Sequence, residues 1–354
     1  MNAINELFSR HVSRGSAPLG SLKGRRLIWV EILLSIAVVV LPGLLTSAYQ
    51  VRMLENIAIF ALLAIGLNLA FGFTGQISLG HAAFYAVGAY GSAILETRFG
   101  LPAIIAWPAA VFLGMLLALL ISLPVMRLSG HYLAMATLAF GLIIEKLLSQ
   151  GGAVTGGHDG IIIPVSRVMG QALQDRFVYV IIIVALIAYW LLRNLTESSV
   201  GRSLRALRDD PDGAASLGIP VARYRTLAVV VAGGLAALAG VFYAHVAQVI
   251  TPEVFAVHTS IQILMMVVIG GMGHRLGGVL GAIVVLIIPE LLYGLDEYRN
   301  IAFGALVLAV LVFLPRGIAG LPEAIGSLYR KLSSRRVHGS DTAAKSMTGA
   351  NHEA

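Results

Sequence analysis

The feature that most constrains this chain is a series of apolar stretches long enough to cross a lipid bilayer. Of its 354 residues, 58% are hydrophobic and 12% are charged, whereas soluble globular chains carry roughly 25% charged residues. A helix needs about 20 consecutive apolar residues to span the hydrocarbon core. Residues 27–45 and 301–314 meet or approach that length, and about ten such stretches occur. The sequence therefore predicts an all-α integral membrane protein.

We expect one membrane domain over residues 27–315, because no gap between the apolar stretches is long enough for a second folded domain. Residues 1–26 are too polar for the apolar core of a signal peptide, so the first stretch is predicted to be a retained span. The tail, residues 316–354, is predicted to be largely disordered. The predicted spans are residues 27–47, 53–72, 78–97, 102–126, 131–149, 177–192, 226–249, 259–272, 277–293 and 300–315.

The basic residues indicate the orientation of these spans. If the N-terminus is cytoplasmic and every span crosses once, 19 of the 25 Lys and Arg lie in inner segments and five in outer ones, with Lys146 left inside a span. The positive-inside rule predicts this asymmetry, so we expect both termini in the cytoplasm. The third span is rich in Gly and Ala, and the eighth is short and ends in glycines. Either of these two could be broken or re-entrant.

Four glycines and several small polar side chains interrupt two apolar helices between Gly66 and Phe84. Non-helical backbone at membrane depth is tolerated where protein or a water-filled cavity satisfies its polar groups, and broken helices often form solute sites. Close helix packing by small residues is the alternative interpretation, and a plain loop is a third. The residues predicted to line a translocation path are Asn68, Gln76, Ser78 and His81.

A second motif, residues 201–220, falls on the predicted cytoplasmic side. Arg202, Arg205 and Arg208 recur every three residues and are expected to crowd toward one helix face. Pro211 stops that helix or starts another, and a short helix from Asp212 is expected to end at Gly218. Such a helix needs a partner surface, or it lies on lipid headgroups, which attract arginine.

Two further patterns bear on chemistry. Residues 155–160 (Thr-Gly-Gly-His-Asp-Gly) offer too few ligands for a metal, so we expect a structured outer loop that meets a partner or caps the path. No phosphate-binding loop, G-x-S-x-G or HExxH motif is present. We therefore predict a chain with no catalytic residues, no metal site and no cofactor. If it works with ATP, another chain must bind the nucleotide.

These three motifs together resemble the permease subunits of branched-chain amino acid ABC importers, the LivH/LivM family, which has urea and amide relatives. The Gly-Leu-Asn-Leu and Ser-Leu-Gly-His-Ala-Ala-Phe runs around residues 66–84 are similar to that family's N-terminal signature. Residues 155–160 resemble its outer loop and residues 201–218 its cytoplasmic segment. The resemblance covers residues 56–315, and the long segment before the signature points to the LivM-like partner.

The resemblance implies a coupling segment, within about 194–224, that docks on an ATPase subunit. The family pattern Glu-Ala-Ala-x-x-x-Gly is matched by Asp212, Gly213, Ala214 and Gly218, with Asp for Glu and Gly for the first Ala. It further implies a multi-pass protein of the bacterial inner membrane that works with a second permease, two ATP-binding subunits and an extracytoplasmic solute-binding protein. The residues expected to form the ATPase-coupling segment are Arg202, Arg205, Arg208, Asp212 and Gly218.

Other function classes remain possible from the sequence. Relatives that carry urea or short amides would share these motifs. An ion-coupled secondary transporter would need no ATPase, although no span holds a central run of acids typical of a proton relay. A membrane-embedded enzyme has little support, because no His and acid cluster occurs within the spans.

Overall fold

The computed structural model describes residues 22–125, 128, 130–163, 167–168, 171–172, 177–292, 301, 304–305, 307–308, 310, 312 and 317–321. The predicted N-terminal segment, the tenth span and the C-terminal tail lie largely outside these residues. The chain divides into two compact units, residues 1–51 and 52–354. In the first unit, α2 (Leu22–Leu44) contains Pro42 and begins five residues before the predicted first span.

The described part is mostly helical, and five helical segments are long and apolar enough to cross a membrane. These are Ala48–Gly72 (α3 with its extension η1), Ala103–Val125 (α5), His131–Gln150 (α6), Phe177–Glu197 (α8) and Val221–Ala247 (α11). Three shorter apolar helices accompany them: Glu31–Leu44 (part of α2), Val257–Gly270 (α12) and Gly277–Leu291 (α13). A multi-pass membrane protein is the architecture that these helices form. Ten spans and the side on which each terminus lies stay predictions.

The centre of the second unit is α4 (His81–Thr97), which packs along α11 and α5. Small residues allow these helices to approach closely, as is common between membrane helices. A Cβ atom at Gly91 of α4 would lie 3.3 Å from the Cβ of Ala110 in α5. At 17 residues, α4 is shorter than the third span predicted from the sequence, because the chain from Phe73 to Gly80 is not helical.

The eighth and ninth predicted spans form a tight hairpin. α12 has 14 residues and α13 has 15, so each is about 21–23 Å long, which is shorter than the hydrocarbon core of about 30 Å. The turn between them includes His274 and Arg275, as the sequence predicts. A Cβ at Gly281 would meet the backbone of Met266, so glycine is required where the two helices cross.

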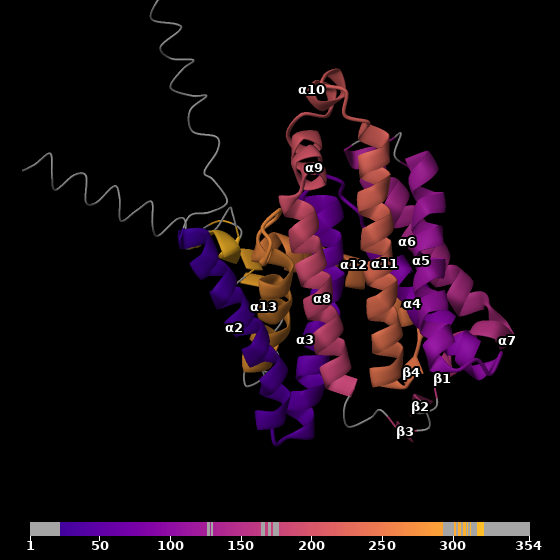
Figure 1. Cartoon of the computed structure of the whole chain (residues 1–354). Coiled ribbons are helices and arrows are strands. Elements are labelled where there is room, and N and C mark those ends of the chain that lie inside the picture. The colour runs from indigo at the N-terminus through magenta and orange to yellow at the C-terminus, as the bar shows by residue number, and fades with distance from the viewer. Residues whose placement is uncertain are drawn as a thin grey trace, which may run out of the picture. The chain divides into compact units, whose positions relative to one another are not determined.

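The second unit has two distinct ends, which Figure 1 shows at its top and bottom. At the top, α9 (Ser199–Asp209) continues beyond the end of α8, and α10 (Pro211–Ser216) lies beyond the end of α11; we call this the α10 end. The opposite end, called here the β1 end, carries α7 (Gly152–Thr155) and the antiparallel pair β1 (Ile161–Ile162) and β4 (Val249–Ile250). A second antiparallel pair joins β2 (Arg167–Val168) to β3 (Gln171–Ala172). Two 3₁₀ turns, η2 (Pro252–Phe255) and η4 (Ile318–Gly320), complete the described elements.

Candidate functional site

The glycine-rich motif breaks the helix that it interrupts. α3 continues into the π-helical turn η1 (Asn68–Gly72), and the chain is then irregular until α4 begins at His81. The amide of Gly75 donates to Phe71 O at 2.9 Å, and the amide of Gln76 donates to Ala70 O at 3.1 Å. These bonds satisfy backbone groups that a continuous helix would pair. π-Helical turns of this kind are frequent at functional sites.

Three of the four predicted path residues line one cavity. Gln76, Ser78 and His81 share it with Thr137 and with apolar side chains of α5, α6 and α11. Its volume is about 30 Å³, which is room for one water molecule and far below the roughly 300 Å³ of a small-molecule site. The structure is therefore closed to solute at this place.

Two polar atoms in this cavity lack a partner. The amide nitrogen of Gln76 donates to Thr74 Oγ1 at 2.8 Å and approaches Arg225 O at 3.5 Å. Within the described residues, Gln76 Oε1 and His81 Nε2 are buried without a hydrogen-bond partner. Because buried polar atoms are normally paired, these two are the best candidates in the motif for contact with water or solute.

Asn68 lies elsewhere. Its amide nitrogen donates to His274 O at 2.8 Å, and its Oδ1 accepts from the amide of Gly273 at 2.9 Å. It borders a separate cavity of about 20 Å³ that Arg193 and Arg275 also line. Asn68 thus joins the broken helix to the turn between α12 and α13, as the packing interpretation of the motif describes.

The predicted coupling segment folds as two short helices. α10 begins at Pro211 and is capped by Asp210, whose Oδ1 accepts from the amides of Asp212 at 3.1 Å and Gly213 at 3.0 Å. Gly218 follows with a φ of +81°, a conformation that favours glycine at a helix C-terminus. The sequence therefore predicted both ends of α10, but it missed Asp210 as the residue that starts the helix.

The three arginines of α9 have different surroundings. Arg202 is exposed, whereas Arg205 Nη1 donates to Thr196 O at 3.1 Å. Arg208 Nη1 donates to Gly72 O at 3.0 Å, and its Nη2 lies 3.1 Å from Asp209 Oδ1. Of the three side chains, Arg208 is therefore bonded directly to the helix break.

The tip of the segment exposes a large apolar side chain. Leu217, between α10 and Gly218, is 81% exposed, and its neighbours Ala215 and Ser216 are exposed as well. Ala214 faces the other way and is buried. At the tip of the segment, this side chain is accessible to a partner or to lipid.

A buried polar cluster at the β1 end escaped the sequence analysis. Glu96 of α4 accepts from Trp107 Nε1 of α5 at 2.7 Å, and its Oε1 lies 2.9 Å from His245 Nε2 of α11. His245 Nδ1 donates to Val241 O at 2.6 Å. Both Glu96 and His245 side chains are less than 10% exposed. The cluster joins the three central helices, and no motif marks it because its residues are up to 149 positions apart.

Replacing Glu96 with Gln should destabilise the central helices. The change removes the charge that faces His245, and breaking one partner of a buried pair costs about 3 kcal/mol. We expect the melting temperature of the purified protein in detergent to fall by several degrees. Trp107→Phe is the comparison variant, because it leaves Glu96 and His245 in place; it removes one N–H donor, for about 1 kcal/mol, and part of the packing of the indole ring. An E96Q protein as stable as the unmodified chain would contradict this role.

No three His, Cys, Asp or Glu side chains gather as metal ligands in the part of the chain that the structure describes. Outside the motifs, Glu197 forms ion pairs with Arg193 at 3.3 Å and with Arg275. The second of these pairs ties α8 to the same turn that Asn68 contacts. The spacing of four residues is a sequence signal for the pair of Arg193 with Glu197, whereas nothing in the sequence marks the pair of Glu197 with Arg275.

Comparisons with known proteins agree with this architecture. The family model described as the permease component of branched-chain amino acid transport systems matches residues 49–314. LivM of Escherichia coli, a high-affinity branched-chain amino acid transport system permease protein, is 30% identical over 73% of this chain and 67% of its own length. LivM of Salmonella typhimurium is 28% identical over 89% of this chain and 81% of its own.

A further relative is BraD of Pseudomonas aeruginosa, a high-affinity branched-chain amino acid transport system permease protein, which is 29% identical over 75% of this chain and 92% of its own length. No solved structure matches the chain. The family model covers well over half of the sequence and includes the broken helix and the α9–α10 segment. The chain therefore belongs to the family of permease components of branched-chain amino acid transport systems.

Proposed function

We propose that this chain is the LivM-like transmembrane permease subunit of an ABC importer that moves branched-chain or related amino acids across the bacterial inner membrane. It is non-catalytic and uses ATP that separate subunits hydrolyse. The observation that carries this proposal is the α9–α10 segment, a capped helix with an exposed apolar tip next to a broken membrane helix. Arg202, Arg205, Arg208, Asp212 and Gly218 form this coupling segment.

The partners that we propose are those that the resemblance to this family implies. A second permease completes the path, two ATP-binding subunits dock at the α10 end, and an extracytoplasmic solute-binding protein delivers solute at the β1 end. Gln76, Ser78 and His81 line the path where it closes, and Asn68 shapes it through the turn after α12. Both termini lie in the cytoplasm. Alternating access by rocking about a central site would open and close the small cavity.

The test is affinity purification of the tagged chain from membranes of its own organism. We expect two ATP-binding subunits and a second permease in the eluate, and loss of leucine uptake in a deletion strain. A chain that purifies without ATP-binding subunits and transports with an ion gradient would be a secondary carrier. Loss of urea or amide uptake with unchanged leucine uptake would assign the subunit to that substrate class.

Orientation can be measured directly, because the chain contains no cysteine. We expect Ala215→Cys, at the exposed tip of α10, to react with a membrane-impermeant maleimide only in inside-out vesicles washed with urea to remove peripheral subunits. Val154→Cys in α7, where the side chain is 57% exposed, should react only in intact spheroplasts. Labelling of Ala215→Cys from outside would exclude docking of the α10 end on a cytoplasmic ATPase.

A further inference from the structure

The α10 end contains a junction at which three elements meet. Arg208 of α9 donates to Gly72 O, the carbonyl of the last residue of η1, at 3.0 Å. Gly72 in turn lies against Gly273 in the turn after α12, where φ is +70°. A Cβ at Gly273 would lie 2.6 Å from Arg208 Nη1 and 2.8 Å from Gly72 O. The coupling helix, the helix break and this turn are thus in direct contact.

A second set of bonds fixes the break to the same turn. Asn68 lies one helical turn before Gly72, and both polar atoms of its side chain bond to the backbone of Gly273 and His274. When both the nitrogen and the oxygen of a side-chain amide bond to the backbone of another element, they fix the position of that element relative to the helix that carries the amide. Displacement of Gly72 would therefore also displace the turn after α12.

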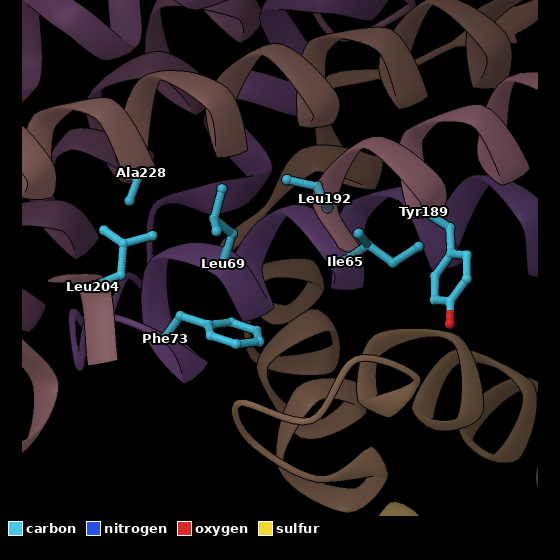
Figure 2. Packing of buried hydrophobic residues seen from close by; sticks show 7 residues of the cluster. All are labelled: Ile65, Leu69, Phe73, Tyr189, Leu192, Leu204 and Ala228. Carbon is cyan, nitrogen blue, oxygen red and sulfur yellow. The ribbon is translucent and has the colours of Figure 1, made fainter. Parts of the chain in front are cut away.

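Apolar packing holds α9 against the same break. Leu204 of α9 belongs to a buried cluster with Leu69 and Phe73 at the break, with Ala228 of α11, and with residues of α3 and α8 (Figure 2). Leu204 is 1% exposed. Interiors are close-packed, so α9 cannot tilt without moving the residues that it touches.

The break leads directly to the cavity. Gln76 follows Gly72 by four residues, and its amide bonds to Ala70 O inside η1. Its side chain and that of Ser78 line the 30 Å³ cavity. A shift of Gly72 thus reaches the cavity wall through a short, hydrogen-bonded length of backbone.

We infer that Arg208 is a positioning residue that transmits movement of α9 and α10 to the helix break, and that it does so through Gly72 rather than by contact with the ATPase. The inference rests on the proposed function, since it needs an ATPase that moves α10. A charged donor makes the link about twice as strong as a neutral hydrogen bond. Arg202 and Arg208 are both exposed on α9, but Arg202, six residues earlier, has no such bond to the break among the described contacts.

The experiment compares Arg208→Gln with the matched control Arg202→Gln in the purified complex. Three quantities are measured: ATP-binding subunits recovered per permease, basal ATP hydrolysis in proteoliposomes, and its stimulation by leucine-loaded binding protein. We expect Arg208→Gln to recover the normal number of ATP-binding subunits, whereas its stimulation, measured relative to its own basal hydrolysis, and its leucine uptake should fall about tenfold or more. Arg202→Gln should keep its stimulation relative to its own basal hydrolysis in the complexes that assemble.

Two results would overturn the inference. If Arg208→Gln releases the ATP-binding subunits, the side chain is a docking contact. If it keeps full stimulation, the bond to Gly72 transmits nothing. If Arg208→Gln fails to fold, Arg208→Lys is used in the same experiment. Lysine keeps the charge but lacks the forked guanidinium group, so we expect intermediate stimulation with full assembly. Failure of the proposed function itself would look different, since the unmodified chain would then recover no ATP-binding subunits.

Discussion

Replacing Leu217 with Asp is expected to abolish leucine uptake and to release the ATP-binding subunits from the purified permease. Leu217 is 81% exposed at the outermost turn of the coupling segment. Replacing its side chain should therefore change the stability of the permease itself very little. Removing an apolar anchor that fills a partner's pocket costs about 2 kcal/mol or more of binding free energy. This corresponds to about a 30-fold loss of affinity. An aspartate must also be desolvated, which adds to the loss.

Leu217→Met is the matched control, because it keeps an apolar side chain of similar volume and should retain at least half of the uptake. The quantity to measure is the ratio of ATP-binding subunits to permease after size-exclusion chromatography. A Leu217→Asp permease that keeps the normal ratio would show that the tip does not face the ATPase. In that case binding of α10 to lipid headgroups, the alternative that its basic neighbours allow, would be the better interpretation.

The helices themselves were largely predictable. α5 and α6 begin and end within one residue of the predicted spans, because each is a long, mostly apolar run with Gly, Pro or charge just outside its ends. α8 continues to Glu197, five residues beyond its predicted end. Arg193 and Glu197 lie one helical turn apart and form an ion pair, so charge did not end that helix as the apolar pattern suggested.

Side-chain directions were less accessible to sequence reasoning. A spacing of three places neighbouring arginines near one face of a helix, but each residue turns by about 100°, so Arg202 and Arg208 point about 120° apart. The break at Gly72 likewise was predicted from glycine content, whereas its bond to Arg208 joins residues 136 positions apart. Only the folded chain brings such partners together, and the same holds for Glu96 and His245.

The path motif was predictable in kind but not in detail. Glycines and small polar residues indicated a broken helix, and the structure has one. Asn68 and Gln76 looked equivalent because both are amides in the same motif. Asn68 is the first residue of the π-helical turn η1, whereas Gln76 lies in the irregular stretch between η1 and α4. One amide therefore faces the turn after α12, and the other faces the cavity.

Substituting Gly88 with Ala is expected to prevent stable folding of the membrane domain. A Cβ at Gly88 of α4 would overlap the carbonyl of Ala237 in α11 and lie 2.5 Å from its Cα. Helix propensity alone predicts the opposite, since Ala is favoured over Gly by about 1 kcal/mol. The added Cβ overlaps backbone atoms, which cannot rotate away. We therefore expect the overpacking cost of about 3 kcal/mol or more to exceed the gain in helix propensity.

Gly91→Ala, one turn later on the same helix, separates these two effects. Its Cβ would lie 3.3 Å from the Cβ of Ala110 in α5, a contact that a slight shift relieves, so the gain in propensity should leave stability unchanged or higher. The measurement is the temperature at which half of each detergent-purified variant aggregates, together with its abundance in the membrane. Equal melting of Gly88→Ala and Gly91→Ala would mean that α4 and α11 do not cross as closely as the structure has them. The most closely packed contact of the central helices would then have to be placed elsewhere.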